Sequence, residues 1–121
     1  MDAISIFMMV AELIIPVIIV VAGIWMDKRP PKEINNVKGY RTRRSQSSQE
    51  AWDFAQHYSG RLLTYVGIAL LVITALLQIP ILNGNVLKVS LFGCLVLIGQ
   101  CIVLCLTIIP TEAALKKKFN V

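Results

Sequence analysis

Charged residues are scarce in this chain. They make up 16% of its 121 residues, whereas an ordinary soluble domain has about 25%. Hydrophobic residues make up 56%, and the mean hydropathy is +0.70. A soluble chain this short could not cover so much apolar surface, so the composition argues against a disordered chain, a secreted disulfide scaffold and a conventional soluble enzyme. It favours a small integral membrane protein.

Residues that carry catalysis are also few. The sequence has one histidine, His57, and three cysteines, all in one apolar run, at Cys94, Cys101 and Cys105. It contains no Ser-His-Asp order with a nucleophile elbow, no glycine-rich phosphate loop and no HExxH motif. We therefore expect no enzymatic activity, no cofactor, no bound metal and no disulfide framework, and we interpret the cysteines as small packing residues.

Three long apolar runs predict transmembrane helices, over residues 3–26, 62–82 and 86–109. Each is near or above the ~20 residues that cross a bilayer as a helix, whose backbone hydrogen bonds are satisfied internally. The first run contains Glu12 and Pro16 and has no basic segment before it, so we interpret it as a retained span and not a signal peptide. The predicted fold is all-α: a polytopic membrane protein with a three-transmembrane-helix bundle, forming a single membrane domain over residues 1–121.

The basic residues predict the orientation in the membrane. Eight of the twelve lie between the first two runs and three lie in a basic tail over residues 110–121, whereas only Lys88 lies near the second loop. The positive-inside rule then places segment 27–61 and the C-terminus in the cytoplasm and the N-terminus outside. Topology and attraction to anionic membrane lipids account for the net charge of +5, so we expect no nucleic-acid partner.

Segment 27–61 is predicted to hold a loop and a short helix. Pro30 and Pro31 end the first helix, because proline cannot continue it. Ser47 followed by Glu50 is a capping-box pattern, which predicts that the next helix begins here. We interpret this helix as amphipathic and lying at the membrane interface between the first two spans. Its apolar arc has Ala51, Phe54, Ala55, Tyr58 and Leu62, with Trp52 at the edge, and its polar arc has Glu50, Asp53, Gln56, His57 and Arg61.

The loop and helix carry a recognisable motif of about 26 residues, formed by Pro30, Pro31, Asn35, Gly39, Tyr40, Arg41, Thr42, Ser45, Glu50, Trp52 and Ala55. This motif resembles the signature of the SdpI family of bacterial membrane proteins. The family is named for an immunity protein that protects cells from a secreted killing peptide. The resemblance implies a protein of the bacterial cell membrane that binds or blocks a membrane-active peptide toxin. It implies that ligand binding depends on the motif residues Asn35, Gly39, Tyr40, Arg41, Thr42, Ser45, Glu50 and Trp52.

Arg41 is the motif residue with the most specific chemistry. Gly39 permits a sharp turn, which presents Tyr40 and Arg41 together. The guanidinium of Arg41 is a planar fork of donors that suits a carboxylate or a phosphate. Three interpretations follow: Arg41 pairs with an acidic residue of the same segment (Glu33, Glu50 or Asp53) and locks the loop, it binds a lipid headgroup or a peptide ligand, or it lies on a solvated loop with no fixed partner.

Three polar residues are predicted to lie within the bilayer: Glu12, Gln78 and Gln100. An acidic side chain in mid-span costs about 2.5–3.5 kcal/mol, and such residues are candidate functional sites. Pro16 has no backbone N–H to donate to the Glu12 carbonyl four residues earlier. Glu12 is then either a proton- or cation-responsive site or a protonated structural residue that hydrogen-bonds Gln78, Gln100 or a threonine.

Glu12 also motivates an alternative function. A small proton-coupled transporter or efflux component would need such an intramembrane acid. Three spans are too few to enclose a pathway alone, so this alternative requires a homo-oligomer.

Overall fold

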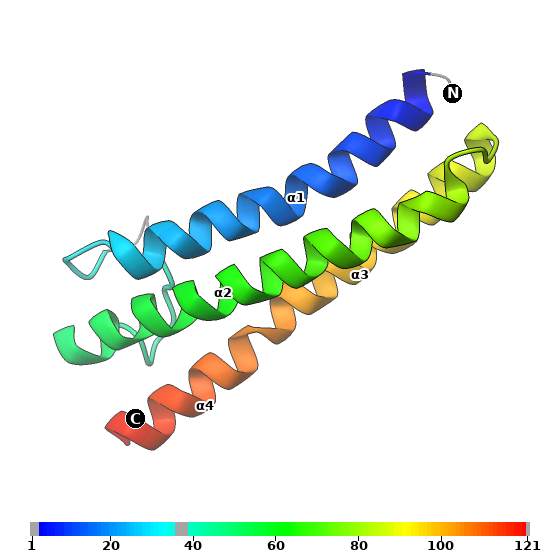
Figure 1. Ribbon diagram of the computed structural model, residues 1–121. Helices are drawn as coiled ribbons and strands as arrows, with labels where there is room; N and C mark the ends of the chain where they lie inside the picture. The colour runs from blue at the N-terminus through cyan, green and yellow to red at the C-terminus, as the bar shows by residue number, and fades with distance from the viewer. Residues whose placement is uncertain (1–2, 36–38, 121) are drawn as a thin grey trace.

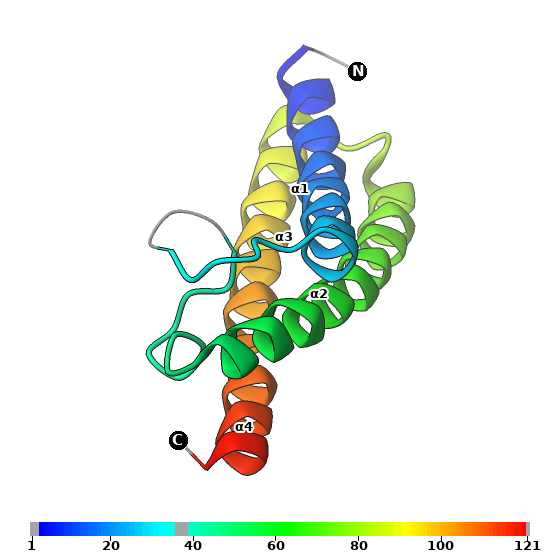
Figure 2. The same cartoon turned by 90° about the vertical axis from the view of Figure 1, so that its left-hand side faces the viewer.

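The computed structural model describes residues 3–35 and 39–120, and α-helices make up most of this part of the chain (Figure 1). The elements are α1 (Ala3–Lys28), α2 (Gln49–Gln78), a short 3-10 turn η1 (Ile79–Ile81), α3 (Val86–Leu106) and α4 (Ile108–Phe119). Helices α1, α2 and α3 lie against one another, and α4 continues the direction of α3 after a bend (Figures 1 and 2). Three segments of the described chain are long and apolar enough to cross a membrane: Ala3–Lys28, Gln49–Ile81 and Val86–Phe119. The prediction of an all-α protein with three spans is therefore confirmed.

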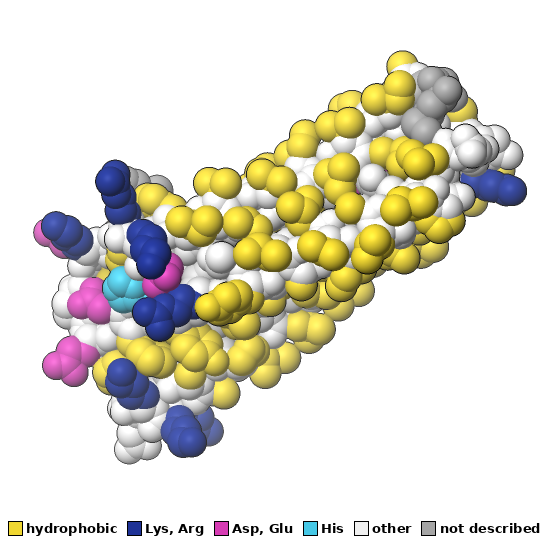
Figure 3. All heavy atoms as spheres, in the orientation of Figure 1, with side chains coloured by type: hydrophobic (Ala, Val, Ile, Leu, Met, Phe, Trp, Pro, Cys, Tyr) yellow, Lys and Arg dark blue, Asp and Glu magenta, His cyan; other side chains and the backbone are white. Residues whose placement is uncertain are grey.

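Burial along the spans is the reverse of that in a soluble protein. The side chains of Phe7 and Leu95 are about 70% exposed (71% and 70%), whereas Glu12 and Gln100 are buried between the helices. Hydrophobic side chains cover the visible length of the bundle, and most of the charged ones gather at one end (Figure 3). Such a surface is stable only in hydrocarbon, so the chain is a multi-pass membrane protein.

Glycines bring α1 and α2 into backbone contact. A Cβ added to Gly23 would lie 2.6 Å from the Thr64 nitrogen, and one added to Gly60 would lie 2.5 Å from the Asp27 nitrogen. Between transmembrane helices, small residues permit this close approach and supply van der Waals contact. The crossing fixes the end of α1 against the first half of α2.

Helix α2 is continuous, so the predicted amphipathic segment is its first part and not a separate interfacial helix. Its 30 residues give a length of about 45 Å, which exceeds the ~30 Å hydrocarbon core. The helix begins one residue later than the capping pattern predicts. Ser48 is the N-cap and accepts a hydrogen bond from the Ala51 N–H (3.0 Å), whereas the Ser47 hydroxyl donates to the Arg44 carbonyl (2.7 Å).

The predicted basic tail is mostly helical and packed. The hydroxyl of Thr111 donates to the Thr107 carbonyl (3.0 Å) just after the break between α3 and α4, where Pro110 cannot donate to the preceding turn. Leu115 is fully buried against Ala51 and Ala55 at the start of α2. The third span therefore extends into a helix that covers the loop-bearing end of the bundle.

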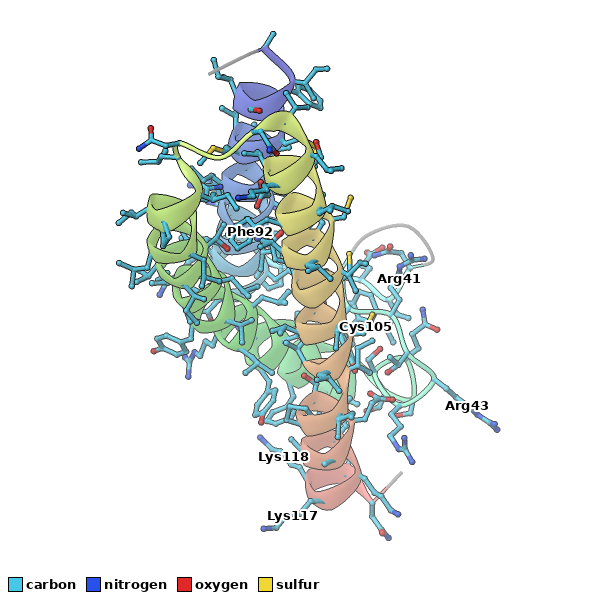
Figure 4. The ribbon with its side chains drawn as sticks, turned by 90° about the vertical axis from the view of Figure 1, so that its right-hand side faces the viewer. Arg41, Arg43, Phe92, Cys105, Lys117 and Lys118 are labelled. Carbon is cyan, nitrogen blue, oxygen red and sulfur yellow. The ribbon has the colours of Figure 1, made fainter. Side chains whose placement is uncertain are left out.

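The cysteines do not pack inside the bundle. Cys94, Cys101 and Cys105 are all exposed on α3, and Figure 4 shows Cys105 on the side of α3 away from α1 and α2. The interpretation as packing residues within the bundle is wrong, because Gly93 and Gln100 occupy the inward face of α3 instead.

Candidate functional site

The motif loop, residues 39–45, is held by the side chain of Gln56. The amide oxygen of Gln56 accepts from the Tyr40 N–H, and its amide nitrogen donates to the Tyr40 carbonyl, both at 2.8 Å. Gln56 is fully buried, so its predicted place on a solvated polar arc is wrong. Gly39 lies directly beside this amide with φ +88°, and a Cβ at Gly39 would overlap the Gln56 oxygen. The motif glycine is therefore required by both its backbone conformation and its contact.

Ser45 closes the motif loop from inside. Its hydroxyl is fully buried, lies 3.1 Å from the Tyr40 carbonyl and 2.9 Å from the Thr42 carbonyl, and accepts from the Thr42 N–H at 2.8 Å. The Ser45 N–H in turn donates to the Thr42 hydroxyl (3.2 Å). These bonds satisfy backbone groups that have no partner in a regular helix or sheet.

Glu112 of α4 binds side chains on the outer side of the motif loop. The hydroxyls of Tyr40 and Thr42 both donate to its Oε2 at 2.9 Å, and Nη1 of Arg44 lies 3.5 Å from its Oε1. Burial raises the pKa of Tyr40, and the neighbouring Glu112 carboxylate raises it further. The phenol therefore stays protonated and donates to the carboxylate. Sequence reasoning missed Glu112, although it is the only acidic residue of the tail.

Trp52 and Asn35 anchor the stretch before the motif loop. The indole N–H of the fully buried Trp52 donates to the Pro31 carbonyl at 2.7 Å. Gln49, one turn earlier on α2, donates to the Lys32 carbonyl (2.6 Å), and Gln46 donates to the Asn35 carbonyl (3.0 Å). The Trp52 side chain thus serves to fix the chain that leaves α1.

Arg41 and Glu50 are exposed at the surface. Figure 4 shows Arg43 extending away from the helices, beyond the loop that carries Arg41. The acidic residue that accepts hydrogen bonds from the loop hydroxyls is Glu112 on α4. It lies outside segment 27–61, where the sequence predicts an acidic partner for Arg41. The pairing of Arg41 with Glu33, Glu50 or Asp53 stays a prediction.

An aromatic cleft of about 860 Å³ lies beside α2 and α4 at the same end of the bundle. Its apolar walls include Phe54, Tyr58, Tyr65 and Phe119, and the Lys118 ammonium lies 4.4 Å from the centre of the Phe54 ring. On its rim His57 and Arg61 both approach Asp27, at 3.4 and 3.2 Å.

The intramembrane polar residues form a cluster in mid-bundle. Gln100 of α3 donates to the Glu12 carbonyl (2.9 Å) and to the Thr74 hydroxyl (3.0 Å), while Gln78 donates to the Met9 carbonyl (2.9 Å). Gln100 therefore satisfies the carbonyl that Pro16 leaves without a helical donor. Of the partners predicted for the Glu12 side chain, Gln78 does approach the carboxyl group and interact with it. Neither carboxyl oxygen reaches full hydrogen-bond geometry with a donor among the described residues.

These features define a small multi-pass membrane protein whose loop is clamped to two of its helices at one end. The chain belongs to the SdpI/YfhL protein family, whose family model matches residues 32–111, from the loop to α4. It is similar to the uncharacterized protein YfhL of Bacillus subtilis (strain 168), with 36% identity over 99 residues that cover 82% of this chain and 80% of the relative. No solved structure gives a significant match. The resemblance found in the motif residues is confirmed at the level of the family.

Proposed function

We propose that this protein is an SdpI-like membrane immunity protein, which protects a bacterial cell by binding a membrane-active peptide toxin or blocking its insertion. Family membership supports a family-level role. The observation that carries the proposal is the clamping of residues 39–45 between Gln56 on α2 and Glu112 on α4. A loop fixed in this way presents its exposed side chains without an ordering cost on binding.

The surface around the motif loop suits an amphipathic peptide. Arg41 stands on the fixed loop, and the aromatic cleft between α2 and α4 supplies apolar wall surface where the spans leave the hydrocarbon. Aromatic side chains at this depth favour ligands with both apolar and polar parts. The basic end would face the cytoplasm by the positive-inside rule, with the N-terminus outside.

The test is survival of sensitive bacteria challenged with a membrane-active killing peptide, with and without this protein at verified membrane levels. We expect the wild type to protect, and Arg41→Ala and Trp52→Ala to lose most of the protection. Arg43→Ala is the matched control, because it removes the same type of side chain from the same loop where it extends away from the bundle. Full protection by Arg41→Ala and Trp52→Ala would contradict the role given to the motif loop.

A second candidate function, proton-coupled transport by an oligomer of this chain, is favoured by the complete burial of Glu12 between the spans. It predicts substrate-driven proton movement into liposomes that Glu12→Gln abolishes. Unchanged flux in that variant, or no flux in the wild type, would remove this candidate.

A further inference from the structure

Three buried side-chain oxygens of the described chain have no hydrogen-bond partner: Oε1 and Oε2 of Glu12, and Oε1 of Gln100. Glu12 is 0% exposed and Gln100 is 3% exposed. Native proteins leave few buried polar atoms unpaired, and each one calls for an explanation. All three atoms are acceptors, so the group that would complete them is a hydrogen-bond donor or a cation.

The three oxygens belong to two residues that touch each other. The Gln100 amide touches residue 12 directly, since its nitrogen donates to the Glu12 carbonyl at 2.9 Å. The Glu12 carboxyl points toward α3 at Gly93, where an added Cβ would lie 3.2 Å from Oε2. Both Gln100 N–H groups are already used, one on Glu12 and one on Thr74. The glycine therefore makes room for the carboxyl, and the nearest amide on α3 has no donor left for it.

The negative charge of an ionised Glu12 also requires a proton or a cation nearby. Glu12 is the only titratable residue of α1 before Asp27 and Lys28 at its far end. The α2 residues beside the cluster are neutral: they are Thr74 and Gln78, whose amide approaches the Glu12 carboxyl. On α3 the nearest charged residue is the exposed Lys88, five residues or roughly 7.5 Å along the axis from Gly93; the remaining titratable groups of that helix are the exposed cysteines. An isolated carboxylate in hydrocarbon is costly unless a positive charge accompanies it.

We propose that Glu12 and Gln100 form a binding site for one monovalent cation, a proton or Na⁺, in the middle of the bundle. One positive charge neutralises the single carboxylate, whereas a divalent ion would leave a net buried charge. A proton on Glu12 would turn one carboxyl oxygen into a donor for a neighbouring acceptor such as Gln100 Oε1, and Na⁺ would take the carboxyl and amide oxygens as ligands. The site requires no movement of the cation across the membrane, so it can exist whether or not the protein transports protons or confers immunity.

The experiment compares the wild type with Glu12→Gln in lipid nanodiscs at neutral pH, first in choline chloride and then with added NaCl. The infrared difference spectrum between the two proteins reports whether the Glu12 carboxyl is protonated or ionised, and thermal unfolding reports stabilisation by Na⁺. A protonated carboxyl that NaCl leaves unchanged identifies the proton as the occupant. Ionisation of the carboxyl together with a higher Tm on adding NaCl, in the wild type alone, identifies Na⁺.

The proposal is overturned if the carboxyl is ionised in choline chloride and neither its spectrum nor the Tm responds to NaCl. Gln100→Ala, which keeps Glu12, is the second variant: we expect a shift of the Glu12 carboxyl band if the proton is bound, or roughly tenfold weaker Na⁺ stabilisation if Na⁺ is bound. Glu33→Gln is the matched control, because it makes the same substitution as Glu12→Gln at an exposed position outside the spans. It should leave both readouts unchanged.

Discussion

Two carboxylates of this protein, Glu112 and Glu12, lie in contrasting surroundings. Glu112 is 21% exposed at the loop-bearing end and has contacts from Tyr40, Thr42 and Arg44. Glu12 is completely buried in the first span, and neither of its carboxyl oxygens has a partner among the described residues. The same type of side chain thus has three polar contacts in one place, whereas in the other only the Gln78 amide approaches it.

The difference follows from what each environment supplies. At the loop-bearing end, hydroxyl and basic side chains are abundant and water is close, so a carboxylate can organise a loop. In mid-bundle the amide donors are two glutamines: Gln100 uses both N–H groups on the Glu12 carbonyl and Thr74, whereas Gln78 uses one on the Met9 carbonyl and approaches the Glu12 carboxyl. We therefore read the Glu112 network as structural support for the motif loop and the Glu12 cluster as a site that needs a further group.

The largest loss of stability is expected for a substitution at the crossing of α1 and α2, which supports both the motif loop and the Glu12 cluster. Gly60→Leu would drive a side chain into the Asp27 backbone at the crossing of α1 and α2. We expect a loss of about 3 kcal/mol in the free energy of unfolding, measured by denaturation in detergent micelles. Gly99→Leu is the matched control, because a Cβ at Gly99 has no neighbour within 4 Å. Equal stability of the two variants would disprove the packed crossing.

Glu112→Ala should free the motif loop and leave the spans intact. It removes the acceptor of the Tyr40 and Thr42 hydroxyls, at a cost of about 2 kcal/mol or roughly thirtyfold in the population of the open loop. Trypsin, which cuts after the arginines of the loop, should cleave Glu112→Ala correspondingly faster than the wild type. Glu112→Gln keeps an acceptor oxygen and should be intermediate, whereas Glu50→Ala should match the wild type. A cleavage rate unaffected by Glu112→Ala would show that the network does not hold the loop.

A pH titration tests the contact between Tyr40 and Glu112 through the raised pKa of Tyr40. The pKa of Tyr40 is raised above its ordinary 10.0, first by burial and second by Glu112, so the folded protein keeps the proton that the unfolded chain releases. The resulting stability is complete below about pH 10 and is lost as the pH rises toward the folded pKa. Thermal unfolding at about pH 8 and pH 11 should therefore show a smaller loss of stability for Tyr40→Phe than for the wild type. The ultraviolet titration difference between the wild type and Tyr40→Phe should show that the Tyr40 phenol ionises above its ordinary pKa of 10.0, and ionisation at the ordinary value would contradict the shift.

The smallest effect is expected at Asp27, a carboxylate that has partners but lies close to water. His57 and Arg61 reach it from α2, and their side chains are 48% and 70% exposed. Such exposed pairs contribute about 0.5 kcal/mol or less. Asp27→Asn should leave the Tm and the trypsin sensitivity nearly unchanged, and a loss as large as that of Glu112→Ala would mean that Asp27 also supports the loop.

Much of the fold could be predicted because a bilayer makes local sequence decisive. Three apolar runs identify the spans, and the motif around Gly39 and Trp52 identifies the family, without knowledge of any long-range contact. The residues at which the helices begin and end were harder to predict. The amphipathic segment and the second span merge into α2, and the tail forms α4, because each is stabilised by packing against the other, as Leu115 packs on Ala55.

The candidate site was predicted only in part, since its motif residues are consecutive in sequence but their partners are not. Gln56 has the helical position of a solvated residue, yet the loop folds over it. Glu112 lies 70 and 72 positions from the hydroxyls it accepts, and Gln100 lies 88 positions from the carbonyl it satisfies.

The sequence by itself determined the spans, the concentration of basic residues at one end and the family, because hydropathy, charge and a short motif act locally. Only the tertiary structure decided which carboxylate holds the loop and which is left without a partner. Hydrogen bonds depend on positions within a few tenths of an ångström, and those positions arise only when helices distant in sequence pack together.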